Sequence, residues 1–599
     1  MSAPMRATDE PEQVAADSRL LRRLLRLLLP YRLMTCGAVL VLLGGAIVQL
    51  AGPELTRRAL DVAVPARDAG LLTTLALLYL GALLLEFVIE YAQTLLTTAI
   101  GQRVMFDLRA TIFRHLQRLS IPYFDAHPVG RLMTRVTSDV ETLNELFSSG
   151  VVTVFGDLFT LVAIMTMMTL VDWRLALVAF STIPLMYLVA RRFRASVRGA
   201  MRDIRGRLAA LNAYLQEQIS GMRVTQLFAR EGESARRFAV LNDAHLDSHL
   251  RSITIYALFF PAVELLASVA VALLLWYGGV RALDGTLTVG TLAAFIQLTR
   301  RFFQPLQDLS EKFNLLQSAM ASSERIFALL DATPTVVESP EPASLPQPLR
   351  GEVRFDDVWF RYRPGDAWVL RGVSFTVAPG STTALVGHTG AGKTTIVALL
   401  LRFHDPERGR ITVDGVDVRS LSFGDLRTAI GYVQQDLFLF TGDVERNLVL
   451  DGRVTPARAR AAAADVGADA VIARLPMGWQ SRLAERGRNL STGERQLLAF
   501  ARALARDPAI LVLDEATSSV DAESEARIQT ALDRLMTGRT SLVIAHRLST
   551  IMHADQILVL HHGVLAERGT HRELLAAGGL YQRLHRLQFT AGVPPWSAA

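Results

Sequence analysis

Long apolar runs fill the first half of the chain, whereas short alternating runs dominate the second half. A transmembrane helix needs about 20 mainly apolar residues. Six stretches meet or approach this length: roughly 34–54, 71–95, 148–171, 175–190, 255–279 and 287–300. Hydropathy alone does not fix the ends of the fourth and sixth, which are short. The pattern predicts a membrane domain of six helices.

The connections between these stretches alternate in length and charge. Short links lie near Pro53–Gly70, Asp172–Arg174 and Gly279–Thr286, while the long connections at 100–147 and 191–254 are rich in arginine. Because positive loops stay on the cytoplasmic side, we expect the long connections and both termini in the cytoplasm. The long loops also repeat apolar residues at helical spacing, as in Leu108 and Ile112, so we expect membrane helices that extend far beyond the bilayer.

Two further segments precede and follow the membrane half. Residues Ser18–Leu33 mix arginines with leucines at helical spacing, which is typical of an amphipathic helix on the membrane surface. Residues 331–350 contain five prolines and predict a stiff, extended linker at a domain boundary. From Gly351 onward, β-rich runs such as Glu352–Phe360 alternate with helical segments, the pattern of a layered α/β domain.

Composition fits a membrane half joined to a soluble half. The 599 residues are 50% hydrophobic and 20% charged, which disfavours an ordinary soluble enzyme and excludes a fibrous or disordered protein. The net charge of +6 comes largely from arginines beside apolar spans, so we expect no nucleic-acid partner. The single cysteine, Cys36, excludes an intrachain disulfide framework.

The second half of the chain contains the pattern of a phosphate-binding loop. The strand-like run Thr382–Val386 leads into GHTGAGKT at 387–394, which is followed by the apolar helix Ile396–Leu401. Its glycines allow backbone N–H groups to surround phosphates, Lys393 reaches the β and γ phosphates, and the hydroxyl of Thr394 can bind Mg²⁺. The strand-to-helix context makes a chance glycine-rich turn a poor alternative.

A second strand supplies carboxylates. The apolar run Ile510–Leu513 ends in Asp514 and Glu515. A nucleoside triphosphatase needs a carboxylate that organises magnesium and a group that orients the attacking water. We predict the first role for Asp514 and that of general base for Glu515.

With these residues, the second half resembles the nucleotide-binding domain of an ATP-binding cassette (ABC) transporter, and the six-span half resembles that of a type IV exporter. The signature loop is matched by Leu490–Glu494, the X-loop by Ala484–Gly487, and the D-loop by Ser518–Asp521. The resemblance covers about residues 18–587. It implies a disordered tail over 1–17, a transmembrane domain over 18–330, the linker over 331–350, an α/β P-loop ATPase domain over 351–587 and a C-terminal tail over 588–599.

The resemblance also assigns site residues. It implies that Lys393, Glu515 and His546 act in catalysis, His546 being the switch histidine, and that Thr394, Gln435 and Asp514 hold Mg²⁺. The implied ATP contacts are Tyr362, which stacks on adenine, Gly387, His388, Thr389, Gly390, Ala391, Gly392, Lys393, Thr394, Thr395, Gln435, Ser491, Gly493 and Asp514. Two such domains would close head to tail, so that each ATP lies between one phosphate-binding loop and the partner's signature loop.

The long cytoplasmic connections carry two further resemblances. Ile121–Leu132 resembles the first coupling helix of exporters and Leu211–Val224 resembles the second. Taken alone, both segments read as ordinary helix corners. If the resemblance holds, they transmit closure of the ATPase domains to the membrane helices.

Four acids interrupt the apolar spans, namely Glu86, Glu90, Asp157 and Glu264. A charge at bilayer depth costs roughly 2.5–3.5 kcal/mol on an insertion scale, so such residues face a cavity or a partner. They either line a cavity for cationic amphiphiles or pair with arginine or polar neighbours between helices. Pairing is the favoured interpretation.

The signature loop departs from the family pattern LSGGQ, with Thr492 for glycine and Glu494 for glutamine. A side chain at 492 restricts the backbone, and a carboxylate at 494 places negative charge near a triphosphate. The family's heterodimeric exporters commonly pair such a chain with one whose Walker B glutamate is replaced. We therefore favour a heterodimer with a second half-transporter over a homodimer.

The combined expectation is ATP-driven export or flipping of amphiphilic drugs, lipids or peptides by alternating access, in the inner membrane of a bacterium. An importer of an envelope lipid or siderophore on the same fold, and an ATP-gated regulator or channel, are the alternatives. The intact set of Lys393, Asp514, Glu515 and His546 favours turnover over gating alone. ATP and Mg²⁺ are the expected cofactors, and the lipid bilayer is an obligatory partner.

Overall fold

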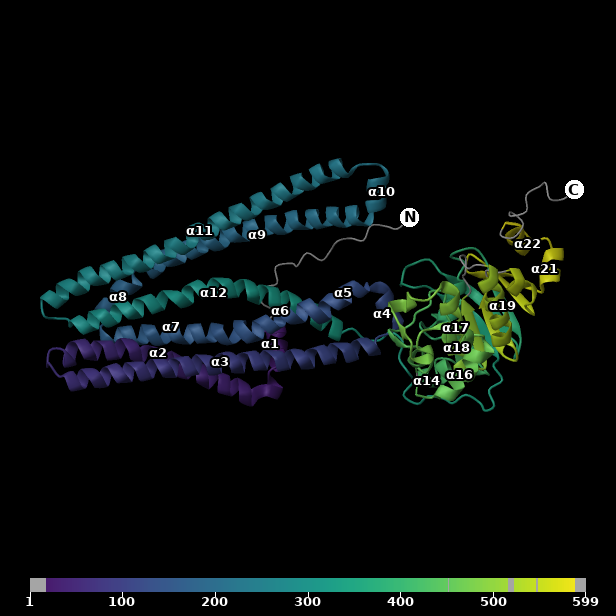
Figure 1. The fold of residues 1–599 in the computed structure, drawn as a ribbon, viewed down its shortest axis with the longest axis horizontal. Coiled ribbons are helices and arrows are strands. Elements are labelled where there is room, and N and C mark those ends of the chain that lie inside the picture. Colours follow the sequence, from purple (N-terminus) through teal and green to yellow (C-terminus); the bar gives the residue numbers. More distant parts are fainter. Residues whose placement is uncertain (1–17, 451, 515–521, 546–547, 588–599) are drawn as a thin grey trace. The chain divides into compact units, whose positions relative to one another are not determined.

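The computed structural model describes residues 18–450, 452–514, 522–545 and 548–587, which divide into two compact units (Figure 1). The first unit comprises residues up to Gln117 together with Pro128–Ala332. The second comprises Arg118–His127 and the chain from Thr333 onward. The expected tails over 1–17 and 588–599 lie outside the described residues.

The first unit is helical. Its helices are α1 (Ser18–Arg26), α2 (Arg32–Arg58), α3 (Ala69–Arg118), α5 (Val129–Thr134), α6 (Val140–Glu145), α7 (Val151–Val171), α8 (Trp173–Phe180), α9 (Ile183–Ser220), α10 (Met222–Leu227), α11 (Glu231–Leu283) and α12 (Val289–Leu330). Five segments in the described part of the chain are long and apolar enough to cross a membrane: Leu29–Ala63, Ala69–Arg118, Val154–Val171, Trp173–Ser220 and Glu231–Leu283. The sixth expected span, 287–300, falls at the start of α12.

Several helices continue where hydropathy ends. Helix α3 has 50 residues and extends far beyond the apolar stretch with which it begins. Helix α11 has 53 residues and begins far ahead of the apolar stretch with which it ends. The expected amphipathic helix stops at Arg26 because Pro30 follows in a 3₁₀ turn. The fourth span is split, since α8 ends at Phe180 and α9 begins at Ile183 with Pro184 in its first turn.

The link expected to begin at Pro53 is wrong, because α2 continues through this proline to Arg58. Proline has no N–H, so it leaves the carbonyl four residues earlier without its helical donor. That carbonyl belongs to Gln49, and the guanidinium of Arg301 on α12 donates to it. A neighbouring helix thus satisfies the freed backbone group, as proline in membrane helices requires.

Helices α9 and α11 lie side by side and are joined at one end by α10, and in Figure 1 this pair diverges from α2, α3, α7 and α12. The other end stays packed on the bundle through a buried cluster that includes Leu175, Leu274 and Phe295. An ion pair between Arg281 and Asp172, 2.7 Å apart, fastens α11 to the N-cap of α8. The diverging pair therefore forms an arm with much of its surface uncovered.

The second unit is a layered α/β domain. Its larger sheet has the order β12-β11-β3-β10-β9-β6, and the second sheet has the order β2-β1-β4-β5. The strands are β1 (Val353–Phe360), β2 (Leu370–Val377), β3 (Thr382–Val386), β4 (Arg408–Val413), β5 (Val416–Asp417), β6 (Ile430–Val433), β7 (Gly442–Asp443), β8 (Arg482–Leu483), β9 (Ile510–Asp514), β10 (Thr540–Ile544), β11 (Gln556–His561) and β12 (Val564–Gly569). Strands β11, β3, β10, β9 and β6 pair in parallel, and β12 is antiparallel.

Helices surround these sheets and complete the fold. They are α4 (Ile121–Ala126), α13 (Lys393–Leu400), α14 (Phe423–Ala429), α15 (Val444–Leu448), α16 (Pro456–Asp465), α17 (Asp469–Arg474), α18 (Thr492–Ala505), α19 (Ala522–Met536), α20 (Leu548–Met552), α21 (His571–Ala576) and α22 (Leu580–His585). The central strands are buried on both faces, so they read as continuous apolar runs such as Ile510–Leu513. The predicted fold class, a helical membrane domain followed by an α/β ATPase domain, is confirmed.

The proline-rich segment after Asp331 is extended, as expected, but it does not act as a free spacer. The N–H of Ala343 donates to the carbonyl of Ser420, and Arg402 donates to the carbonyl of Val337. Leu345 also packs against the core of the second unit. Prolines prevent a helix here, while intervening backbone groups still anchor the segment.

Candidate nucleotide site

The parallel sheet brings the ends of four chemically important strands to one edge. Strand β3 leads into the phosphate-binding loop, β9 ends at Asp514, and β6 is followed by Gln435. Strand β10 lies between β3 and β9, with Ile544 paired to both Leu385 and Asp514. Because carboxyl ends of parallel strands share one edge, these groups face a common region, which is where open α/β sheets bind ligands.

Tight backbone approaches hold the phosphate-binding loop. A Cβ at Gly387 would lie 2.4 Å from the carbonyl oxygen of Leu560 on β11, so only glycine fits. Gly390 and Gly392 have φ of +81° and +106°, in the left-handed region that favours glycine. The residue types at these positions therefore follow from the loop geometry that phosphate binding requires.

Lys393 lies beneath the loop and is buried. Its ammonium donates to the carbonyl of Gly387 at 2.7 Å and to that of His388 at 3.1 Å. Burial lowers the pKa of Lys393, and the negative charge of Asp514 opposes this change. Thr394 beside it is exposed, so its hydroxyl is open to a metal ion, whereas Thr395 is buried.

Asp514 ends β9 and is buried, and it has a polar or electrostatic partner in the structure. Burial, together with the negative charge of Asp514, raises the pKa of the neighbouring Tyr432 phenol to about 12. The sheet thus brings Lys393 and the Tyr432 phenol near the negative charge of Asp514. Gln435, two residues beyond β6, is exposed.

Tyr362 contacts the first turn of α13 through its hydroxyl. Its hydroxyl lies 3.0 Å from that of Thr395, and half of the residue is exposed. Its ring packs edge-on against Phe360 and His404, with centroids 5.1 and 5.2 Å away. Phe360, the alternative aromatic on the same strand, is 4% exposed and has no free face for a base.

His404 also links this aromatic cluster to α4. The imidazole of His404 lies 3.9 Å from the carboxylate of Asp125. Burial lowers the pKa of His404, and the negative charge of Asp125 opposes this change. Ser120, at the N-cap of α4, exchanges hydrogen bonds with the backbone of Val336, at 3.0 and 3.3 Å.

The signature loop forms the N-terminus of α18. Ser491 is the N-cap, and its hydroxyl accepts a hydrogen bond from the N–H of Glu494 while the Glu494 carboxylate accepts one from the N–H of Ser491. This capping box is the same as glutamine would form at 494. The Glu494 carboxylate also lies 3.7 Å from the guanidinium of Arg474. Gly493 is buried, and Thr492 is exposed.

Some predicted site residues cannot be placed. Glu515, His546 and the D-loop Ser518–Asp521 lie outside the described residues. Conversely, sequence reasoning did not single out His561 and His562, which the structure brings next to His388 of the phosphate-binding loop. Their only signal in the sequence is that two histidines occur together at a strand end.

Comparison with known proteins identifies the family. Residues 35–306 match the family described as ABC transporter transmembrane region, and residues 370–518 match the family described as ABC transporter. The chain belongs to the ABC transporter family. It is an exporter-type half-transporter that spans the membrane several times and couples ATP hydrolysis to transport.

Two relatives and one solved structure illustrate the likeness. This ABC transporter is 35% identical over 584 residues to an ATP-dependent lipid A-core flippase of Syntrophus aciditrophicus, covering 97% of this chain and 96% of the relative. It is 39% identical over 518 residues to a fatty acid ABC transporter ATP-binding/permease protein of Mycobacterium tuberculosis, covering 86% and 81%. A bacterial Atm1-family ABC exporter with ATP bound aligns with a TM-score of 0.76 and 28% identity, over 96% of this chain and 100% of that chain.

Proposed function

We propose that this transporter exports or flips a lipid-like amphiphile across a bacterial inner membrane, with both termini in the cytoplasm. The observation that carries the substrate class is a groove of ≈ 540 Å³ between α2 and α7. Leu50, Phe159 and Val162 are among its apolar walls, and Glu54 is its carboxylate. Glu54 forms ion pairs with Arg57 and Arg58 on the same helix. The largely apolar trough suits the acyl chain of an amphiphile.

The relatives support this class of substrate. One is named a lipid A-core flippase and the other a fatty acid transporter. The arginine-rich long connections support the orientation, because positive loops remain on the cytoplasmic side. An importer or an ATP-gated channel would use the same fold, and the direction of ATP-dependent movement separates these alternatives.

The acids in the spans divide into two groups. Asp157 on α7 pairs with Lys312 on α12, which is the pairing between helices favoured from the sequence, with a lysine as the basic partner. Glu90 and Glu264 are exposed on the helical unit, and Glu86 is partly exposed. We infer that these three glutamates, rather than Asp157, contribute to recognition of a polar or cationic head.

The transporter works as a dimer, since its fold dimerises, and we propose that α9 and α11 pack on the partner. Both helices carry apolar side chains that stay largely exposed among the described residues, including Tyr187, Leu188, Leu250 and Leu258. Apolar surface of this extent is stabilised by a second subunit or by lipid. Such an arm would place each chain's second coupling segment, near α10, on the partner.

We further propose that the partner is a different half-transporter. Thr492 stands where the family pattern has glycine, so this position carries a side chain. Its hydroxyl accepts a hydrogen bond from the guanidinium of Arg495. The side chain of Thr492 and the negative charge of Glu494 would weaken the donor set that this loop offers to ATP bound on the partner, so the two ATP sites would be unequal.

In the proposed reaction, Lys393 and the loop N–H groups bind the β and γ phosphates, and Tyr362 stacks on adenine. Thr394, Gln435 and Asp514 would hold Mg²⁺, and their oxygen atoms are the ligand type this ion prefers. Bound Mg²⁺ would neutralise charge on the phosphates. Glu515 would take a proton from the attacking water, with His546 contacting the γ phosphate.

A groove variant tests the substrate class. Val162→Trp fills the space between α2 and α7, so the amphiphile concentration for half-maximal stimulation of ATPase activity should rise at least about tenfold. The matched control is Leu77→Trp on α3, an exposed position outside the groove, which should leave this concentration unchanged. Equal responses of the two variants to a panel of lipids and detergents would remove the groove from substrate binding without affecting the ATPase assignment.

A further inference from the structure

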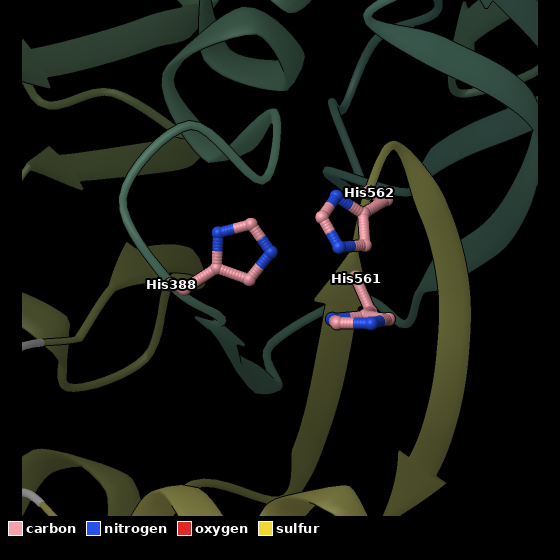
Figure 2. A group of neighbouring side chains, drawn as sticks. All are labelled: His388, His561 and His562. Atoms are coloured by element: carbon pink, nitrogen blue, oxygen red, sulfur yellow. The ribbon is translucent and has the colours of Figure 1, made fainter.

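Three histidines from separate parts of the chain meet beside the phosphate-binding loop. His388 follows Gly387 in that loop, His561 ends β11, and His562 lies in the turn to β12 (Figure 2). One ring nitrogen of each lies within 4.8 Å of those of the other two. The ring centroids are 4.2 to 5.3 Å apart. Consecutive residues of a strand point to opposite faces, but the φ of +47° at His562 turns its ring back toward His561.

Two of these imidazoles have a buried nitrogen without a hydrogen-bond partner in the described part of the chain. They are Nε2 of His388 and Nδ1 of His561. In His388 the other nitrogen, Nδ1, lies 2.8 Å from the carbonyl of Thr389, which places the proton on Nδ1. Nε2 therefore carries the lone pair. A metal-binding histidine usually donates its second ring N–H to a carbonyl, a carboxylate or water, as His388 does here.

The backbone holds the three residues in place. Gly387 abuts the carbonyl of Leu560, which fixes the loop against the end of β11. Arg371 binds the turn, because its N–H donates to the carbonyl of Gly563 at 2.8 Å and its guanidinium donates to that of His562 at 2.5 Å. Backbone contacts and the Arg371 side chain thus hold together the loop and the turn that carry the three rings. Such preorganisation lowers the cost of assembling a ligand set.

We propose that His388, His561 and His562 form a binding site for a transition-metal ion of the Zn²⁺ type, adjacent to the phosphate-binding loop. Imidazole nitrogen is a ligand for zinc, nickel and copper, whereas Mg²⁺ prefers oxygen, so this site differs from the one that serves ATP. Three protein nitrogens leave the fourth tetrahedral position for water. His562 is exposed, which gives an ion access from solvent.

Small side-chain rotations complete the site. A tetrahedral ion with Zn–N bonds of about 2.0–2.1 Å needs nitrogens about 3.4 Å apart. The ligand atoms lie within 4.8 Å of one another, so they must approach by up to about 1.4 Å. A bound ion would fasten the phosphate-binding loop to the β11–β12 hairpin.

The test uses the full-length chain in detergent with its affinity tag removed. Zn²⁺ is titrated against a chromophoric chelator, and the visible absorption of added Co²⁺ reports tetrahedral coordination. Wild type should bind one tight equivalent per chain, and His562→Gln should weaken it at least about tenfold. Zn²⁺ should also raise the melting temperature of wild type more than that of the variant, because a ligand of the native state stabilises it.

The matched control is His249→Gln. His245 and His249 form another pair of close histidines, on α11, with ring centroids 4.7 Å apart. The control should retain the tight equivalent and the Co²⁺ absorption. The proposal is overturned if wild type has no tight equivalent, if His562→Gln binds Zn²⁺ as wild type does, or if His249→Gln abolishes binding. His561→Gln should weaken Zn²⁺ binding as much as His562→Gln does, and wild-type binding by His561→Gln would also overturn the proposal.

Discussion

At the scale of single residues, burial and hydrogen bonding give the nucleotide site its chemistry. The ammonium of Lys393 is held by the carbonyls of Gly387 and His388, at the level of the loop that would surround phosphates. The phenol of Tyr362 is oriented by the hydroxyl of Thr395 while half of the residue remains exposed.

Tyr362→Ala should raise the ATP concentration for half-maximal ATPase activity. A stacked base contributes about 1–3 kcal/mol, so the increase should be roughly 5- to 150-fold. Steady-state ATPase assays measure it. The control Tyr362→Phe keeps the ring and loses only the contact with Thr395, so it should remain within about threefold of wild type. If the ATP concentration for half-maximal activity is unchanged in Tyr362→Ala, this residue does not stack on adenine.

Glu515→Gln should bind ATP normally but hydrolyse it about 10²- to 10⁴-fold more slowly, because it removes the proposed general base. Single-turnover hydrolysis and nucleotide-binding assays separate the two effects. Lys393→Ala is the comparison, since loss of its cation should weaken ATP binding itself. Near-normal turnover in Glu515→Gln would assign the proton transfer to another group.

At the scale of elements, sequence predicted the strands and the phosphate-binding loop well but missed features decided by contacts between distant segments. The strand predicted over Thr382–Val386 has the same bounds in the structure, because buried parallel strands are short apolar runs. The passage of α2 through Pro53 depends on Arg301, which is far along the chain. The meeting of His388 with His561 likewise depends on the pairing of β3 with β11. Neither contact leaves a local pattern.

The α18 signature loop gives a prediction about the partner's ATP site. Thr492→Gly with Glu494→Gln restores the family pattern, and glutamine can replace glutamate in the capping box. The melting temperature of the ATPase domain should therefore change little. ATPase activity of the chain purified alone as a dimer should rise several-fold, because the donors facing the partner's ATP improve. No gain in activity would mean that Thr492 and Glu494 are tolerated variants in a homodimer.

The packing of α7 on α12 gives a prediction about stability. Lys312 and Asp157 form a partly buried ion pair, so Asp157→Asn should leave a poorly compensated ammonium and destabilise the helical unit by about 1–3 kcal/mol. A lower melting temperature in detergent checks this. Asp157→Asn combined with Lys312→Met removes both charges and should recover most of the loss. If the double variant melts as low as the single one, the pair is not what holds these helices together.

At the scale of the whole molecule, the chain is one subunit of a dimeric transporter. Its helical unit exposes apolar faces on α9 and α11. The sequence predicted the membrane and ATPase halves from hydropathy and motif order. It could not specify the partner or the substrate, because apolar cavities adapt to many shapes and the second subunit is encoded elsewhere if it differs.

The central claim is that ATP hydrolysis in this transporter moves an amphiphile out of the cytoplasm. The most direct test is uptake of a fluorescent amphiphile into inverted membrane vesicles from cells that produce the protein natively, so that any partner is present. Adding ATP outside the vesicles should drive accumulation inside, and replacing the wild-type chain with Glu515→Gln should abolish it. Movement in the opposite direction, or accumulation that does not depend on ATP and Glu515, would contradict the account.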